Sequence, residues 1–271
     1  MITLPLTPAQ LAVVLELIDG LTRISERVAL VGGLVPPILL QHLDPDGYEA
    51  AATVRATADF DIAVDLALTP DAFDELETML RGSGWTANRQ QNQFRWCKDG
   101  AKVDVMPVPA GIERGAESAV AVAARFQCGD PHEFFRGYEF ALQEPVTVEI
   151  SALGNTRSLT VAGVVSLLAM KLQARLDRRA DRKRDARDVG WLLRYMATDV
   201  VVAELRRASL RRDDLVEFVV ARLASSFTDA DADGCMDYGT EAHGLVDEYT
   251  EPHREAVAAA VRRLLDAYRR S

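Results

Sequence analysis

The stretch DFDIAVDL, Asp59 to Leu66, begins with two carboxylates one residue apart, Asp59 and Asp61, in a largely apolar segment. Its period-2 alternation is typical of a half-buried β-strand, in which residues two apart point to the same face. Asp59 and Asp61 therefore lie side by side, about 7 Å apart at the backbone, while the apolar residues face the core. Two like charges so placed repel each other unless a cation lies between them. The pair predicts a divalent-cation site, with Mg²⁺ as the expected ion and Mn²⁺ as its substitute.

A third carboxylate comes from the segment AKVDVMPV, Ala101 to Val108, in which Asp104 alternates with valines. This segment reads as the second strand of a hairpin whose first strand spans residues 93–98 and whose turn is Asp99-Gly100. Three carboxylates on neighbouring strands can hold two metal ions about 3.5–4 Å apart. That arrangement stabilises both the attacking and the leaving oxygen of a phosphoryl displacement.

A glycine pair lies upstream, at the end of the apolar run RVALVGG that spans residues 27–33. The run predicts a strand, and the residues from Leu34 to Leu43 predict a helix. Between a strand and a helix, Gly32 and Gly33 let backbone N–H groups approach a triphosphate, and the helix N-terminus adds a favourable partial charge. The combination of a glycine turn with the three aspartates is more specific than any one of its parts.

The bulk composition is that of a globular protein, with 271 residues of which 48% are hydrophobic and 27% charged. No apolar run approaches the roughly 20 residues that a bilayer crossing needs, so we expect no membrane contact and a cytoplasmic location. The three cysteines are widely spaced and match neither a disulfide framework nor a thiolate metal site. The net charge of -10 argues against non-specific binding of nucleic acid through bulk charge and leaves binding through a local basic patch open.

The order of the predicted elements indicates an α+β fold, with a small mixed β-sheet, flanking helices and a helical C-terminal half. Residues 146–151 predict a strand after the hairpin. From Thr160 onward the pattern changes to amphipathic helices, with apolar residues between Val161 and Leu176 on one face. We therefore expect a first domain at residues 1–157 and a helical C-terminal domain at residues 158–271.

These motifs resemble those of the nucleotidyltransferases of the DNA polymerase β-like superfamily, and above all its AbiEii/AbiGii toxin-like group. The matching segments are LVGG (30–33), RATADFD (55–61), KVDV (102–105) and KLQARLDRRADRKRDARDV (171–189). The resemblance implies a nucleotidyltransferase core that moves a nucleoside monophosphate from a nucleoside triphosphate to a hydroxyl of RNA or protein, with Mg²⁺. It also implies a toxin of a type IV toxin–antitoxin system, with a tRNA or a protein as acceptor and a cognate antitoxin as partner.

The resemblance gives each candidate residue a role. The candidates for catalysis and metal binding are Asp59, Asp61 and Asp104, and those for nucleotide binding are Gly32, Gly33, Thr57, Lys171 and Asp185. The first two aspartates would be metal ligands, and Asp104 would also orient or deprotonate the attacking hydroxyl. The glycines and Lys171 would hold the phosphates, and Asp185 would position Lys171 or the nucleotide. Thr57 is a candidate to bond a phosphate or a carboxylate of the metal site.

The same residues allow other interpretations. A catalytically inactive protein of this fold would bind a nucleotide or a partner without transferring a group. A D-x-D glycosyltransferase usually needs a parallel βαβ domain before its D-x-D, whereas fewer than 60 residues precede Asp59. Structural interpretations are a polar strand edge or an N-cap pair for Asp59 and Asp61, and a hairpin residue for Asp104. The glycines could form a tight turn, and Lys171 could be a solvated or snorkelling lysine.

Overall fold

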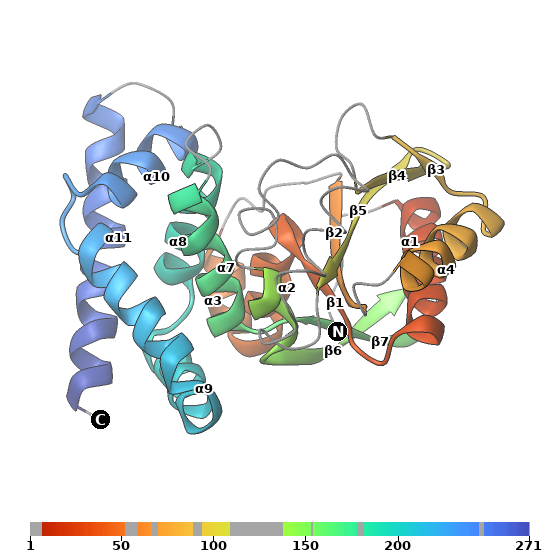
Figure 1. The fold of residues 1–271 in the computed structure, drawn as a ribbon. Helices are drawn as coiled ribbons and strands as arrows, with labels where there is room; N and C mark the ends of the chain where they lie inside the picture. Colours follow the sequence, from red (N-terminus) through yellow and green to blue (C-terminus); the bar gives the residue numbers. More distant parts are fainter. Residues whose placement is uncertain are drawn as a thin grey trace. The chain divides into compact units, whose positions relative to one another are not determined.

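The structure is a computed structural model, and it describes residues 7–51, 59–66, 70–88, 94–108, 138–152, 154–177, 182–243 and 247–270. The chain divides into two compact units (Figure 1). Unit 1 consists of Met1–Val35 and Arg55–Ala162, and unit 2 of Pro36–Val54 and Gly163–Ser271. The two units interleave in sequence, because residues 36–54 belong with the helical C-terminal half.

Unit 1 is built on a mixed sheet, which in the described residues has seven strands in the order β3-β4-β5-β2-β1-β7-β6. The strands are β1 (Val28–Val31), β2 (Asp59–Asp65), β3 (Thr86–Ala87), β4 (Arg95–Lys98), β5 (Ala101–Val108), β6 (Pro145–Ala152) and β7 (Asn155–Ala162). β2 pairs in parallel with β5, and β1 with β7, whereas the other pairs are antiparallel. This mixed sheet with its helices is compatible with the predicted α+β class.

Two hairpins form the outer parts of the sheet. The predicted hairpin β4–β5 is present, and its turn residues Asp99 and Gly100 have φ values of 49° and 79°, as a two-residue primed turn requires. In the second hairpin only β6 was predicted. The prediction of helix from Thr160 onward is wrong over its first residues, because β7 continues to Ala162. Val161 belongs to this strand, and its spacing from the valines that follow resembles a helical face.

Helices α1 (Pro8–Ile24) and α4 (Pro70–Gly82) pack on one face of this sheet. α1 begins with a capping box, in which Thr7 and Gln10 satisfy each other's backbone N–H groups. Lys98 of β4 forms an ion pair with Glu16 of α1, and Arg81 of α4 lies over the Trp96 ring. Trp96 and Lys98 alternate with Arg95 and Cys97 along β4, so the latter two lie on the other face.

The short 3-10 helices of unit 1 are η1 (Gly32–Leu34), directly after β1, and η2 (Tyr138–Leu142). Unit 2 is helical in its described residues, and its helices are α2 (Val35–Leu43, of which Val35 belongs to unit 1), α3 (Pro45–Ala50), α7 (Val164–Asp177), α8 (Arg182–Tyr195), α9 (Thr198–Ser226), α10 (Asp233–His243) and α11 (Asp247–Arg270). α9 is kinked at Arg212, whose backbone is not helical. The Asp44 carboxylate caps α3 by accepting from the Gly47 N–H, and it also accepts from the Ala197 N–H before α9.

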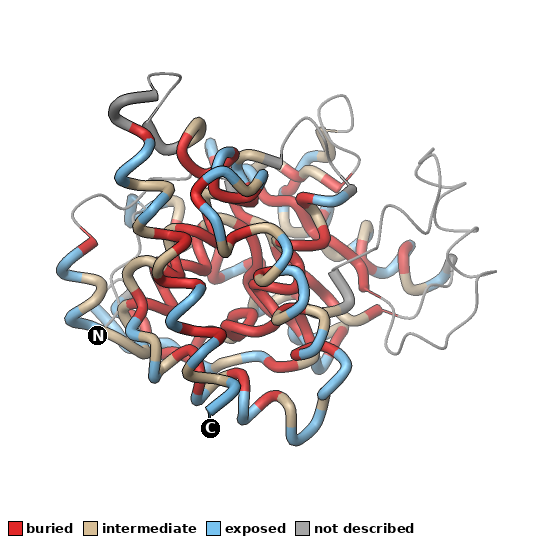
Figure 2. Tube along the Cα trace, turned by 90° about the vertical axis from the view of Figure 1, so that its left-hand side faces the viewer, coloured by how far each residue is buried: buried red, intermediate tan, exposed pale blue. Residues whose placement is uncertain are grey.

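The apolar side chains of the opening stretch are buried. Phe60, Ile62 and Val64 of β2 are at most 1% exposed, so the apolar residues of the opening stretch do face a core. On the outer helices of Figure 2, buried and exposed positions succeed each other at short intervals, as amphipathic helices require. The apolar stripe of α7 is also buried from Val164 to Leu172.

Candidate active site

Two of the predicted aspartates meet on the sheet. β2 and β5 are parallel neighbours, and their register places Asp61 beside Asp104. Partners on adjacent strands share a face, so both carboxylates lie on one face with their backbones about 4.8 Å apart. Asp104 is 4% exposed and Asp61 is half-buried. This face is opposite to the one that α1 and α4 cover.

The motif RATADFD contains two further candidate residues, Asp59 and Thr57, which are less fully described. Asp59 begins β2, and its backbone is in register with Lys102 of β5. Its side chain lies outside the described part of the structure, and so does the whole of Thr57. Lys102 is exposed and shares the face of Asp104. The described face therefore carries a cation that sequence reasoning did not assign.

Gly32 lies against the Asp61 carboxylate. The backbone of Gly32 is left-handed, with φ +77°, and a Cβ placed on it would come within 1.9 Å of Asp61 Oδ2. An L-residue is excluded here both by its own backbone preference and by the carboxylate. The structure thus confirms the predicted strand–glycine turn–helix order, with β1 ending at Val31 and α2 beginning at Val35 after η1. Gly33 lies in the same turn, half-buried.

Arg95 holds the third aspartate from the neighbouring strand β4. Its Nε donates to Asp104 Oδ1 at 2.8 Å, and its Nη2 donates to Asp104 Oδ2 at 2.9 Å. The side chains are 18% and 6% exposed, so this is a largely buried, bidentate ion pair. Such charge-assisted pairs are among the strong hydrogen bonds of proteins. Arg95 was absent from the predicted site.

The sequence nevertheless contained a signal for Arg95. A two-residue turn at Asp99-Gly100 fixes the hairpin register, because Lys98 must then pair with Ala101. Counting outward from that pair puts Arg95 opposite Asp104, as observed. The long-range pairing of Asp61 with Asp104 has no such local rule, because β2 and β5 are separated by α4 and two strands.

The donor set of this face suits a hard divalent cation. Mg²⁺ takes carboxylate oxygens and usually needs only one or two of them when substrate phosphates complete its shell. Asp61 and Asp104 supply such oxygens, and Asp104 already binds a cationic group, the guanidinium of Arg95. Among the described side chains, no group of three His, Cys, Asp or Glu residues is arranged to hold a metal ion. A metal here would therefore rest on Asp61 and Asp104, with Asp59 as the predicted third ligand.

Lys171 and Asp185 lie together in unit 2. Lys171 Nζ is 3.1 Å from Asp185 Oδ1 and 2.7 Å from Asp188 Oδ2, and its side chain is 14% exposed. Burial by itself lowers the pKa of Lys171, but the charges of Asp188 and Asp185 and their hydrogen bonds outweigh burial and raise the pKa above its ordinary value. Lys171 is therefore a largely buried lysine, held in its charged form by two carboxylates, that links α7 to α8, and the interpretation as a solvated lysine is wrong. Asp188 is a partner that the sequence reasoning missed.

A second buried cation lies one helical turn further along α7. The Arg175 side chain is 4% exposed, and its Nη2 lies 2.9 Å from Asp233 Oδ2 and 3.0 Å from Asp237 Oδ2. The Arg175 guanidinium also lies over the Phe227 ring. These contacts join α7 to the N-terminal half of α10, so α7 is tied to two other helices by ion pairs.

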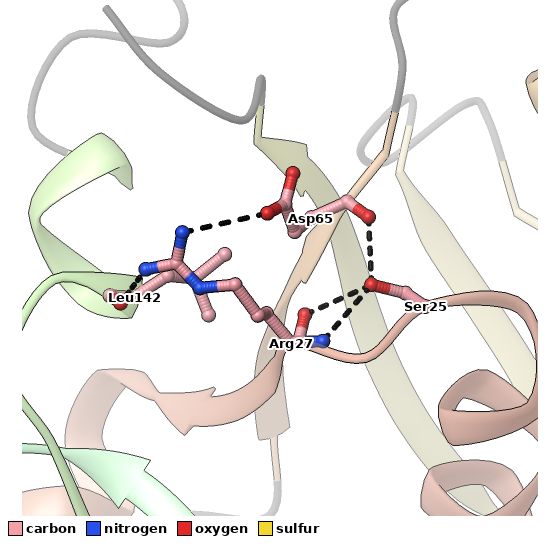
Figure 3. Close-up of polar contacts among 4 residues, drawn as sticks. All are labelled: Ser25, Arg27, Asp65 and Leu142. Atoms are coloured by element: carbon pink, nitrogen blue, oxygen red, sulfur yellow. Dashed lines mark hydrogen bonds and ion pairs between the residues drawn. The ribbon is translucent and has the colours of Figure 1, made fainter.

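The last aspartate of the opening stretch has a different environment. Asp65 closes β2 at the end opposite to the glycine turn, and Arg27 Nη1 lies 3.5 Å from its Oδ2 (Figure 3). Arg27 also donates to the Leu142 carbonyl of η2. The Ser25 hydroxyl donates to the Asp65 carbonyl at 2.7 Å, and it accepts from the Arg27 N–H. These contacts fasten the start of β1 to the end of β2 and to η2, and nothing in them favours a ligand.

Comparisons of the chain with models of known protein families, with curated proteins and with solved structures find no match. The described helices include none that is long and apolar enough to cross a membrane. The case for a function therefore rests on the geometry of the residues above and on the resemblance in their motifs.

Proposed function

We propose that this chain is a metal-dependent nucleotidyltransferase, which moves a nucleoside monophosphate from a nucleoside triphosphate to a hydroxyl group. The observation that supports the proposal best is the register of β2 and β5, which sets Asp61 beside Asp104 on the face next to Gly32. Two carboxylates from distant parts of the chain share one face there, beside a glycine that tolerates no side chain. A purely structural role for Asp61 gives no reason for this close approach of a left-handed glycine.

In the proposed reaction the acceptor oxygen forms a bond to the α-phosphorus, and the bond from that phosphorus to the pyrophosphate oxygen breaks. Asp61 and Asp104 would hold the metal ion, and Asp104 would orient the attacking hydroxyl and accept its proton. Mg²⁺, when bound, supplies the positive charge that offsets the charge developing on the phosphate oxygens. Gly32 keeps the backbone of the turn close to this charge, where its neighbours can donate N–H groups to phosphate. Catalysis of this kind consists mainly of positioning and charge neutralisation.

The resemblance extends the proposal beyond the chemistry of the site. It adds Lys171 and Asp185 as nucleotide-binding residues, a tRNA or a protein as acceptor, and a toxin role with a cognate antitoxin as partner. Lys171 stays charged and is held by two carboxylates, so its position is well defined. Its contribution to phosphate binding can be tested by Lys171→Met, which removes the charge with little change in length.

The decisive experiment supplies the full chain with each nucleoside triphosphate labelled at the α-phosphate, together with Mg²⁺ or Mn²⁺ and total RNA or cell lysate. Transfer of label to a macromolecule, lost in Asp61→Asn, supports the proposal. Label that stays in the nucleotide under all conditions, despite a measured binding of nucleotide, contradicts it.

A second candidate is a catalytically inactive protein that keeps this fold to bind a nucleotide or a partner. The observation in its favour is the Arg95–Asp104 pair, because both Asp104 oxygens already bind a guanidinium. Calorimetry distinguishes the two candidates. The inactive protein binds ATP or CTP with Mg²⁺ yet releases no pyrophosphate with any acceptor.

A further inference from the structure

Arg95 reaches into the proposed metal site from β4, on the face that Asp61 and Asp104 share. The hairpin that carries it has other sources of stability. Four backbone register pairs join β4 to β5, and on the opposite face the buried Trp96 lies against Val103. The ion pair is therefore not needed to define the strand pairing, and its position beside Asp61 requires a separate explanation.

The charges on this face supply that explanation. Asp61 and Asp104 lie on adjacent strands in register, so without a cation their carboxylates would repel each other in a partly buried environment. The Arg95 guanidinium offsets this repulsion and donates one hydrogen bond to each oxygen of Asp104. A divalent ion bound by the same carboxylates would offset the same repulsion. Either the guanidinium or the ion can therefore offset the repulsion between the two carboxylates.

We infer that Arg95 is an internal counter-cation that competes with the divalent ion for Asp104, so that metal entry requires the guanidinium to release at least one carboxylate oxygen. This inference rests on the proposed function, since it takes the Asp61–Asp104 face to be the metal site. The released guanidinium carries donors in a fork that matches phosphate oxygens. Arg95 then becomes a positioning residue whose partner changes from Asp104 to the substrate phosphates when metal and nucleotide bind together.

The test is direct titration of Mn²⁺ into the full chain, followed by electron paramagnetic resonance of the free ion. We compare the wild type with Arg95→Gln, and with Lys98→Gln as a matched control. Lys98→Gln removes one positive charge from the same strand on the opposite face, where Lys98 pairs with Glu16. Arg95→Gln should bind Mn²⁺ at least about tenfold more tightly than the wild type, which corresponds to about 1.4 kcal/mol. Lys98→Gln should bind it as the wild type does.

Thermal unfolding gives a second readout without any substrate. Without metal, Arg95→Gln should melt at a lower temperature than the wild type, and saturating Mn²⁺ should remove most of that difference. Arg95→Lys keeps the charge but loses the bidentate geometry, so it should bind Mn²⁺ with intermediate affinity. It also serves as the test variant if Arg95→Gln does not fold.

Equal Mn²⁺ affinity in the wild type and both Arg95 variants would overturn the inference alone, and so would weaker binding in the variants. The first result would make Arg95 purely structural, and the second would make it a support for Asp104 as a ligand. Binding of Mn²⁺ by Arg95→Gln but not by the wild type would support the inference in its strongest form. Absence of Mn²⁺ binding from all these proteins would overturn the proposed function, and the inference with it.

Discussion

Two arginine–aspartate pairs lie at different places along β2 and its neighbours, and they differ in almost every physical respect. At one end, Arg27 meets Asp65 through a single contact of 3.5 Å, and the Arg27 side chain is 50% exposed (Figure 3). Next to the glycine turn, Arg95 meets Asp104 through two short hydrogen bonds, and both side chains are largely buried. Exposed ion pairs contribute little to stability, whereas losing one partner of a buried pair is costly. The Arg27–Asp65 pair thus has a structural role, whereas the Arg95–Asp104 pair is part of the candidate site.

The sharpest contrast between the two ends should appear in catalysis. Asp59→Ala and Asp104→Ala should each lower nucleotide transfer by about 10³-fold or more, because they remove a ligand of the charge-neutralising ion. Asp65→Asn, at the other end of the same strand, should stay within a few-fold of the wild type. The measurement is the initial rate of label transfer from an α-labelled nucleoside triphosphate. If Asp59→Ala and Asp104→Ala transfer label as fast as Asp65→Asn, the assignment of these aspartates to catalysis is wrong.

Stability should separate the two arginines next. Arg95→Gln leaves Asp104 buried without its bidentate partner and should lower the free energy of unfolding of unit 1 by about 3 kcal/mol in the absence of metal. Arg27→Gln should cost less than about 1 kcal/mol, since the Arg27 side chain is half exposed and its contact with Asp65 is long. Urea titration followed by tryptophan fluorescence measures both variants. A similar loss of unfolding free energy in Arg95→Gln and Arg27→Gln would mean that burial does not make one ion pair more stabilising than the other.

The glycine turn offers a matched pair of substitutions. Gly32 and Gly100 have nearly the same left-handed φ, +77° and +79°, but only Gly32 faces an obstacle. Gly100→Ala should therefore cost only the backbone penalty, about 1–2 kcal/mol. Gly32→Ala must in addition displace the Asp61 carboxylate and should cost about 2 kcal/mol more. If both variants unfold at the same urea concentration, the close approach of Gly32 to Asp61 is not present in solution.

The smallest expected effect concerns the thiols. Burial raises the pKa of Cys235 to about 12, so Cys235 should not react with a thiol reagent at pH 8 while the protein is folded. A folded-state pKa above the unfolded value means that this thiol stabilises the fold fully below about pH 8.5 and progressively less as the pH rises toward 12. Cys97, two residues from Arg95 on the same face, is partly exposed and should react.

The same labelling experiment also compares the two arginines, with Cys128 replaced by serine throughout. Arg95→Gln should speed the labelling of Cys97 by a few-fold, because it removes a long side chain and loosens the hairpin, whereas Arg27→Gln should not. Cys235 provides the internal reference in each protein. Faster labelling of Cys235 in Arg95→Gln would instead indicate a loss of order that is not confined to the hairpin.

Local patterns predicted most of the elements that position the site. The alternation around Asp61, the turn at Asp99-Gly100 and the capping box at Thr7 each depend on a few neighbouring residues, and each is present in the structure. The prediction of helix from Thr160 onward was wrong at its start. β7 was partly taken for helix because the spacing of its last valine fits both periods, and only its pairing with β6 and β1 selects the strand.

The sequence by itself determined which residues could carry the chemistry: carboxylates at alternate positions of a buried strand, a third on a hairpin strand, and a glycine at a turn. The tertiary structure alone decided which of them meet. The parallel register of β2 and β5 pairs Asp61 with Asp104 across α4 and a hairpin, and the packing of α7 on α8 gives Lys171 its second partner, Asp188. The reason is physical: side-chain direction follows from local backbone geometry, whereas strand order and helix contacts depend on burial over the whole chain.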